Sequence, residues 1–501
     1  MYISEKIKDE YKHWKQGDII FIDAGTGSGK SHFIRNELSD FAESNFDQIL
    51  LLVNRIELKK QIDALLESQN NKAIKTITYQ TIEHNKEFDF RPYKYIVCDE
   101  CHYFTEDSPF NFESDVSLKL IKGLNDHIRV FMSATGGTIF NHLEITRKIK
   151  PYKYRIKRDF SNILSLSFYN YKESTEPVER FIKEQFSNST DKIIWFCRSL
   201  EQAEKLHNKY SDSSFMCSRS QKGYIHLITK DMIIDDGDKI TFKGKWLFTT
   251  NVLDNGFDFK DDNIKLIICD YPDINSVLQC IGRKRKLHDK DNVHIVLADH
   301  NNQAISGFVR DRKEALKQAQ YIIDGKLGEY FKIAGKFSDK SKYIVMDVLE
   351  SDGKDYHKKV SYPKFLKVKS DYEMYSHIQS DQADLNKFRV LNGEKKRNDG
   401  FKQYISAELK QAKFYDLDEI YGRYNLSEYL AELVDIKLFK AEQKDLINRI
   451  DYRADGKQFK SYSALNDALK QLKLNYVISS RVETKGENRN KRYWIINKIT
   501  D

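Results

Sequence analysis

The stretch Ala24-Gly25-Thr26-Gly27-Ser28-Gly29-Lys30-Ser31 decides how the first part of this chain is expected to fold. An apolar run at 18–23 precedes it with the length of a buried strand, and residues 32–38 follow it with helical spacing. The three glycines allow a tight turn in which successive backbone N–H groups point at one anion, at the positive end of the helix. The pattern predicts a phosphate-binding loop between a strand and a helix; a glycine-rich turn without a ligand is the alternative.

Two side chains at the end of this loop have the chemistry to handle a nucleotide. Lys30 is expected to reach the β- and γ-phosphates, and the Ser31 hydroxyl is expected to ligate Mg²⁺. The sequence thus predicts ATP and Mg²⁺ as cofactors, with residues 24–31 as the ATP-binding loop.

Short apolar runs recur through the first 150 residues, and amphipathic segments separate them. This alternation is typical of a parallel β-sheet with helices on both faces. Each run ends in a polar cluster, and open α/β sheets bind ligands at the carboxyl ends of their strands. The alternation starts again after a connection at 138–185, in which a strand is expected at 165–169. The expected strands of the first part are 19–22, 49–53, 73–78, 95–98 and 130–133.

The apolar run Tyr95–Cys98 ends in two adjacent carboxylates. At a phosphate-handling site one carboxylate can hold Mg²⁺ while another polarises an attacking water. We assign the first role to Asp99 and the second to Glu100, because the run follows a phosphate-binding loop in the same α/β pattern. His102 follows, and we favour a coupling role for it over a place on the surface.

Cys98 and Cys101 have the gap of a metal-binding or redox pair, but they bracket Asp99-Glu100, and neighbouring strand residues face opposite ways. No structural metal is therefore expected. The six cysteines lie mostly in apolar runs, as free cysteines do in proteins of a reducing compartment.

No apolar stretch reaches the roughly 18 residues of a membrane helix, and the start lacks the apolar core of a signal peptide. The expected location is the cytoplasm.

With Asp99-Glu100-Cys101-His102, the loop at 24–31 resembles motifs I and II of superfamily 2 helicases of the DExH (DEAD/DEAH-box-like) type. Asn54–Gln61 is similar to motif Ia, Thr78–Thr81 to the motif Ib region, and Ser133-Ala134-Thr135 to motif III. Hydroxyls, an arginine and helix N-termini at strand ends suit contacts with a phosphate backbone. The resemblance implies nucleic-acid contact or coupling roles for Arg55, Thr78, Gln80, His102, Ser133 and Thr135.

The resemblance continues to about residue 300. Segment 192–210 is similar to motif IV, Trp246–Asp258 to motif V, and Gln279–Lys286 to motif VI. It implies a second RecA-like domain without a phosphate-binding loop of its own, with Asp258 at the ATP and Thr250 and Asn251 at the nucleic acid. The expected fold class is α/β, with two tandem RecA-like parallel-sheet domains and a mostly α C-terminal region.

The segment Gln279-Cys280-Ile281-Gly282-Arg283-Lys284-Arg285-Lys286 is expected to complete an ATP site at the domain junction. Cations that arrive on domain closure neutralise charge at the γ-phosphate, and arginine fingers of this kind are worth about 10³–10⁵ in rate. Arg283 matches the family's first arginine. The family's second arginine is expected three residues later, but Lys286 occupies that position and the nearest arginine, Arg285, stands one residue before it. Residues three apart share a helix face and residues two apart do not, so either Lys286 acts electrostatically or the local backbone departs from a helix. The expected catalytic residues are Lys30, Glu100, Gln279, Arg283 and Lys286.

The net charge of +8 lies in the last two hundred residues. Residues 301–501 hold 39 Lys and Arg against 30 Asp and Glu, whereas residues 1–300 are nearly balanced. A surplus on one segment permits a phosphate-backbone partner. We expect RecA-like domains at 1–155 and 156–300, a helical, lysine-rich connecting region at 301–400, and an accessory domain at 401–501.

Within the connecting region, a charged helix is expected at 308–323 and a loop near 325–328. Residues 351–400 show few periodic runs, and 394–400 resembles a linker. The tail has a capped amphipathic helix at 461–472 and two apolar strands, 476–478 and 493–496, around a basic turn. This order resembles a winged-helix module, which contacts DNA phosphates and grooves. A small α+β cap with a solvated turn remains the alternative.

Taken together, the motifs predict an ATP-driven superfamily 2 helicase or translocase whose partner is nucleic acid, DNA more than RNA, with no membrane association. Two alternatives are a duplex translocase that remodels branches without separating strands, and a sequence-specific initiator that uses the C-terminal region as its binding module. A P-loop switch or kinase would leave Arg283 and the second α/β half unexplained.

Overall fold

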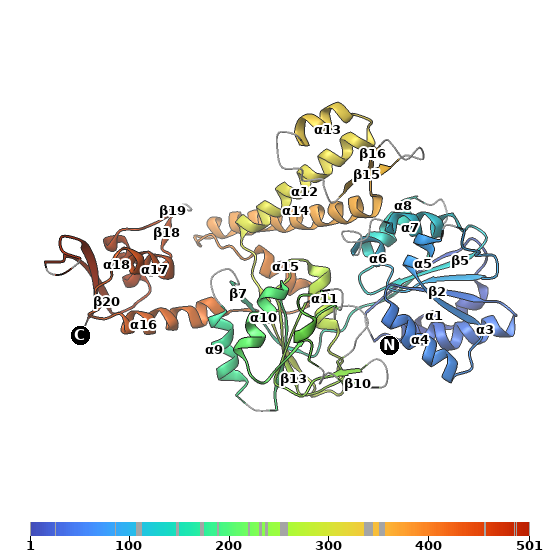
Figure 1. Cartoon of the computed structure of the whole chain (residues 1–501), viewed down its shortest axis with the longest axis horizontal. Helices are drawn as coiled ribbons and strands as arrows, with labels where there is room; N and C mark the ends of the chain where they lie inside the picture. The colour runs from blue at the N-terminus through green and yellow to red at the C-terminus, as the bar shows by residue number, and fades with distance from the viewer. Residues whose placement is uncertain are drawn as a thin grey trace. The chain divides into compact units, whose positions relative to one another are not determined.

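The computed structural model of the chain (Figure 1) divides into two compact units, Met1–Leu166 with Ser189–Phe414 and Ser167–Asn188 with Tyr415–Asp501. Each unit is described by itself. The structure describes residues 2–25, 27–85, 87–106, 113–146, 150–170, 175–187, 190–218, 221–229, 233–235, 239–250, 259–334, 344–349, 356–454, 457–484, 486 and 488–499.

The first sheet of the larger unit has six strands in the order β3-β2-β4-β5-β1-β6, and every neighbouring pair is parallel. All five runs expected from the sequence are strands of this sheet, whereas β6 lies in a segment that was expected to be a connection. The strands are β1 (Ile19–Ala24), β2 (Ile49–Val53), β3 (Ile74–Thr78), β4 (Tyr95–Cys98), β5 (Ile128–Ser133) and β6 (Tyr152–Ile156).

Alternate side chains of β1 enter two different hydrophobic clusters, one on each face of the sheet. Ile20 and Ile22 belong to the first cluster, and Ile19 and Phe21 belong to the second. This period of two is what a strand buried on both faces requires. The helices over the two faces are α1 (Ile3–Ile7), α2 (Lys30–Phe33), α3 (Ser39–Ser44), α4 (Ile56–Ser68), α5 (Tyr79–His84), α6 (Tyr103–Glu106), α7 (Ser114–Gly123) and α8 (Gly137–Thr146).

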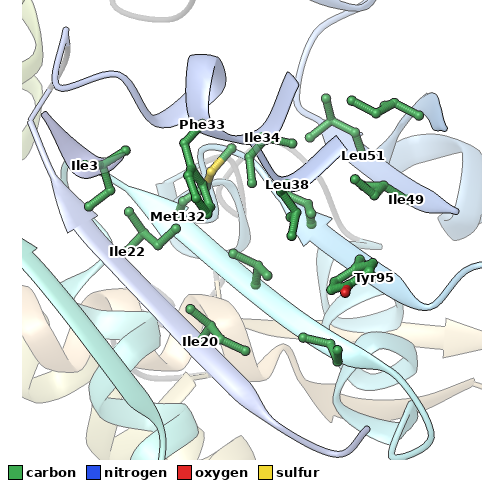
Figure 2. Close-up of a cluster of buried hydrophobic side chains, with 14 of the residues drawn as sticks. Ile3, Ile20, Ile22, Phe33, Ile34, Leu38, Ile49, Leu51, Tyr95 and Met132 are labelled. Carbon is green, nitrogen blue, oxygen red and sulfur yellow. The ribbon is translucent and has the colours of Figure 1, made fainter. Parts of the chain in front are cut away.

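The helix after the phosphate-binding loop is held on the sheet by apolar packing. Phe33 of α2 lies over the strands with Ile34 and Leu38 of the π-helical turn that continues it, as Figure 2 shows. All three side chains are fully buried. Because the helix cannot slide over this close-packed surface, the loop at its N-terminus is fixed relative to β1.

The second sheet of the larger unit contains β14-β13-β8-β12-β9 in this order, again with parallel pairs. Side chains of Ser199 and Asp273 cap α10 (Leu200–Lys209) and α11 (Ile274–Gly282) by accepting backbone N–H groups. Two parallel α/β sheets confirm the expected fold class. The strands are β8 (Lys192–Phe196), β9 (Ser213–Met216), β12 (Trp246–Thr249), β13 (Ile264–Cys269) and β14 (Val293–Ala298), and a hairpin of β10 (Ile233–Asp235) and β11 (Lys239–Thr241) precedes β12.

Residues 302–408 form helices and a small hairpin. The longest helix of the described residues, α14, spans Tyr362–Leu391, in a segment whose sequence shows few periodic runs. Its apolar residues follow no clear periodic stripe, but charged pairs four residues apart, such as Lys367 with Asp371 and His377 with Asp381, lie along it. The other elements are α12 (Asn302–Ile323), α13 (Leu327–Ala334), β15 (Val345–Leu349), β16 (Tyr356–Val360) and α15 (Gly400–Glu408).

The smaller unit combines helices with an antiparallel hairpin. Leu438 exchanges backbone hydrogen bonds of 2.8 and 2.9 Å with Trp494, so a short strand pairs with the last strand of the hairpin. The order is therefore helix, short strand, two helices, and a hairpin whose turn is basic. The elements are α9 (Glu176–Gln185), a helical turn at Asp418–Gly422, α16 (Arg423–Glu432), α17 (Lys440–Ile450), α18 (Tyr462–Gln471), β20 (Tyr476–Val482) and β21 (Arg492–Lys498), with small pairings of β18 (Arg453–Ala454) with β19 (Lys457–Gln458) and of β17 (Tyr415–Asp416) with the end of β7 (Ile163–Tyr169).

Among the helices of the described residues, none combines the length and the apolar character that a membrane span requires.

Candidate active site

The glycine-rich loop leaves the carboxyl end of β1 as the sequence predicts. Gly27 and Gly29 have φ of +77° and +83°, which side-chain-bearing residues rarely adopt. The Ser28 hydroxyl donates to the Gly25 carbonyl at 2.6 Å, and the buried Lys30 ammonium donates to the carbonyl of Ala24 at 2.8 Å. Lys30 is therefore held inside the curve of the loop, where a phosphate would meet it. Thr26 lies outside the described residues.

The two adjacent carboxylates lie at the end of β4 in different environments. Asp99 is buried, and burial together with the Glu100 carboxylate raises the pKa of Asp99 to about 7. Burial also opposes ionisation of Glu100, but a hydrogen bond from His102 and the nearby charges of Lys30 and Arg283 outweigh it and hold its pKa well below the usual range. Glu100 thus lies among cations that favour its ionised form, which a water-polarising base requires.

Asp99 and Ser31 supply the oxygen ligands that Mg²⁺ prefers. The raised pKa of Asp99 reports a buried carboxylate whose negative charge lacks full compensation in the protein alone. A divalent cation would supply that compensation. These two residues therefore fit a site in which Mg²⁺ takes few protein ligands and completes its shell with phosphate oxygens and waters.

A buried hydrogen-bond network joins five of the predicted residues. The Gln279 amide nitrogen lies 2.9 Å from the Thr135 hydroxyl and 3.1 Å from His102 Nε2. Since the amide donates to Nε2, we assign the proton of His102 to Nδ1, which lies 2.9 Å from the Ser133 hydroxyl and 3.3 Å from Glu100 Oε2. His102 therefore lies in contact both with Ser133, at the end of the first sheet, and with Gln279 of α11, which packs with the second sheet.

The chain leaves the path of α11 after Gly282, although the C-cap residue Arg283 keeps helical angles (φ −73°, ψ −28°). Phe259 donates to the Arg283 carbonyl at 2.8 Å and accepts from the Arg285 N–H at 3.0 Å, which forms a single bridge between Phe259 and Lys284. The Lys284 ammonium forms a fully buried ion pair of 2.5 Å with Asp291.

Arg283 and Arg285 each approach a different part of the expected ATP site. Arg283 is close enough to lower the pKa of Glu100. The Arg285 guanidinium lies against the phosphate-binding loop, where a Cβ added at Gly27 would be 2.5 Å from Nη1. Lys286 instead forms an ion pair of 3.4 Å with the exposed Asp289. Of the two alternatives left open by the sequence, the backbone departure is the one observed.

A cavity of about 240 Å³ lies between the loop and this segment, and Gly25, Gly27, Thr135, Gln279 and Arg285 line it. Arg158, which follows β6, also lines it; its guanidinium donates to the Ala134 carbonyl, and its Cγ lies close to Gly25. The sequence analysis missed Arg158, because it belongs to no motif and its only signal is a basic stretch between the two α/β halves.

The residues expected to contact nucleic acid also follow strand ends. Arg55 follows β2 and is exposed, Thr78 ends β3, and Gln80 lies in the first turn of α5. The Thr78 hydroxyl lies 3.0 Å from that of Thr81. Thr250 follows β12 in the second sheet. Asn251 and Asp258 fall outside the described residues.

Comparison with known proteins gives a likeness of fold. No protein-family model matches the sequence, and no curated protein matches it. A variant of S. cerevisiae Dbp5 bound to RNA and ADP BeF3 is 15% identical with a TM-score of 0.42, over 58% of this chain and 81% of that one. The Escherichia coli DEAH/RHA helicase HrpB is 13% identical with a TM-score of 0.42, over 61% of this chain and 43% of that one. The chain resembles these helicases in fold. The likeness is loose, so the proposals below rest on the residues of the cleft.

Replacing Lys284 with methionine leaves the buried Asp291 carboxylate without its countercharge. Losing one partner of a buried ion pair costs about 3–5 kcal/mol, so Lys284→Met should lower the thermal midpoint measured by calorimetry. The double variant Lys284→Met/Asp291→Leu removes both charges and should recover part of the loss. Lys286→Met changes an exposed residue and serves as the control. A midpoint that stays unchanged in Lys284→Met would contradict the buried pair.

Proposed function

We propose that this chain is an ATP-driven nucleic-acid motor of superfamily 2 that hydrolyses ATP in the cleft between its two parallel α/β domains. The observation that carries the proposal is the buried network in which Gln279 of the second domain meets His102 and Thr135 of the first. A nucleotide switch or kinase does not need a second domain that reaches the general base through a hydrogen-bonded histidine. A motor does, because the state of its ATP must change how the two domains meet.

Each residue of the cleft has a role that its position supports. Lys30 and the loop hold the phosphates, Ser31 and Asp99 hold Mg²⁺, and Glu100 accepts a proton from the attacking water. Mg²⁺ supplies charge neutralisation at the β- and γ-oxygens. Arg283 and Arg285 meet the charge that develops on the γ-phosphate as it is transferred.

We propose DNA as the track and a winged-helix module in the smaller unit, because a helix and an antiparallel hairpin with exposed basic residues lie together there. Arg489, Lys491 and Arg492, in and beside the turn of its hairpin, are all exposed. The exposed residues of α18 include both Asp467 and Lys470, so the basic charge lies on the hairpin rather than on this helix. Such a distribution suits contacts with phosphates, which position a protein without reading sequence. It favours a motor that binds without sequence preference over a sequence-specific initiator.

Strand separation and duplex translocation differ in what the motor does to its track. In the first case the chain would unwind a forked substrate; in the second it would displace a third strand from a triplex without opening the duplex. Both activities need the same ATP site, so the two assays, run side by side on the full chain, separate the alternatives. Backbone contacts by Arg55, Thr78, Gln80 and Thr250 are proposed for either case.

Lys30→Ala and Glu100→Gln should each abolish ATP hydrolysis stimulated by nucleic acid, because the first removes the phosphate-binding ammonium and the second removes the general base. The measurement is phosphate release, titrated with single-stranded, duplex and forked DNA and with RNA. Glu67→Gln, on the exposed side of α4, is the matched control and should leave the rate unchanged. Stimulated hydrolysis that survives both cleft variants would refute the assignment, and stronger stimulation by RNA would refute DNA as the track.

Arg285→Ala should lower kcat far more than Lys286→Ala, because the Arg285 guanidinium lies against the phosphate-binding loop, whereas Lys286 forms an ion pair with the exposed Asp289. The expected loss for Arg285→Ala is on the order of 10³-fold, the lower end for an arginine finger. Lys286→Ala should stay within about threefold of the wild type, as a surface charge change does. Equal losses in the two variants would show that Lys286 supplies the second cation.

Changing Arg489, Lys491 and Arg492 together to alanine should weaken DNA binding without changing thermal stability, since all three side chains are exposed. Each lost phosphate contact lowers the slope of log K against log salt by about 1, so the slope should fall by about 2–3. Lys444→Ala, an exposed change on α17, is the control. An unchanged slope would remove the hairpin from the interface, and a loss restricted to one DNA sequence would favour the initiator alternative.

A further inference from the structure

A buried charge cluster lies where α14 passes the two α/β domains. The Lys367 ammonium is 2.8 Å from Asp273, 2.9 Å from Asp371 and 3.2 Å from Glu106. The Lys367 side chain is only 11% exposed. One cation thus contacts three carboxylates at a site largely shielded from water, where the charges act on one another more strongly than at the surface.

The three carboxylates come from three different parts of the larger unit. Glu106 ends α6, which begins directly after the segment Asp99–His102. Asp273 is the N-cap of α11, whose far end carries Gln279 and leads to Arg283. Asp371 lies one turn along α14 from Lys367 itself.

The cluster connects α6 and α11 directly as well. The Asn275 amide of α11 donates to Glu106 at 3.2 Å, and Asp273 accepts the Ser276 N–H at 2.9 Å. Burial and the neighbouring carboxylates Asp273 and Asp371 raise the pKa of Glu106 to about 7, although Lys367 opposes the shift. Without the Lys367 ammonium, these carboxylates would repel one another across the junction between the two domains.

Further contacts show that α14 touches both domains. The Thr138 hydroxyl of α8 donates to Ser370 at 3.0 Å, on the side of the first domain. The Tyr375 hydroxyl donates to the Pro272 carbonyl at 2.9 Å, directly before α11 of the second domain. Figure 1 shows α14 running past α6 and α8. The helix is therefore in a position to control how far the two domains stand apart.

We propose that Lys367 is a positioning residue for ATP hydrolysis: by holding Glu106 and Asp273 together, it fixes α6 against the start of α11 at the spacing in which Gln279 and Arg283 meet His102 and Glu100. This inference rests on the proposed function for its kinetic consequence. Lys367 touches none of the residues proposed to hold ATP, so its effect passes through the alignment of the domains. Helix α14 then acts as a strap across the junction.

Lys367→Met retains most of the side-chain length but removes the charge. We expect kcat to fall by about tenfold or more while KM for ATP changes by less than about threefold, because the phosphate-binding loop is untouched. Lys367→Arg keeps the charge and should recover most of the rate. Adding Glu106→Gln to Lys367→Met removes one repelling charge and should recover part of it. Lys369→Met, on the same helix with a 55% exposed side chain, is the control and should behave as the wild type.

A structural readout separates this inference from the proposed function. Amide hydrogen exchange of the full chain should show lower protection in α6 and α11 of Lys367→Met, with the central strands of both sheets as protected as in the wild type. This measurement does not require activity, so a wild-type chain without ATPase would refute the proposed function and leave the exchange result to decide the inference. Unchanged protection in α6 and α11, or a kcat equal to that of the wild type, would overturn it.

Discussion

The side-chain amide of Gln279 is the contact on which the arrangement of the larger unit depends. It donates to Thr135 and His102, which belong to the first domain, while its own helix belongs to the second. A buried amide that loses its partners costs about 1–3 kcal/mol, so the two domains either meet with this network made or separate far enough to hydrate it. At an intermediate separation of the two domains, the Gln279 amide would have neither its protein partners nor water to bond with. In the proposed reaction, this all-or-none contact is what converts the state of the ATP into the relative position of the domains.

Local chemistry explains how much of the site could be predicted from the sequence. The phosphate-binding loop, Asp99-Glu100 and the five strands were all predictable, because glycine spacing, apolar run length and strand-end polarity are properties of neighbouring residues. The choice between Arg285 and Lys286 as the second cation was left open, because both a continued helix and a departure from it were possible beyond Gly282. The backbone there is set by a bridge to Phe259, some two dozen residues earlier, and by the burial of Lys284 against Asp291. A pairing partner so distant in sequence cannot be found from local periodicity.

The distance between contacting residues along the chain also explains why the sequence shows no clear periodic pattern for α14. A helix that buries one apolar face shows a periodic stripe, whereas α14 is held by point contacts between polar groups, such as Tyr375 with Pro272 and Thr138 with Ser370. The partners of Lys367 are drawn from residues 106, 273 and 371, and no pattern in a sequence window can join positions so far apart. Propensity and periodicity report local structure, while this helix owes its place to tertiary contacts.

The balance of charges in the cleft gives a reason why ATP, rather than its hydrolysis product, would favour the arrangement in which the two domains are in contact. Lys30 and Arg283 lie near Glu100, and Arg285 lies against the phosphate-binding loop. Cations brought so close repel one another unless an anion lies between them. The γ-phosphate is the anion that the two arginines of the second domain would reach. Release of the γ-phosphate would leave the β-phosphate bound to Lys30 and the loop. It would also remove the negative charge that offsets the repulsion between the cations of the two domains. In the proposed reaction, contact between the two domains would therefore depend on the γ-phosphate, which the cations of the second domain would reach, rather than on the other phosphates of the nucleotide.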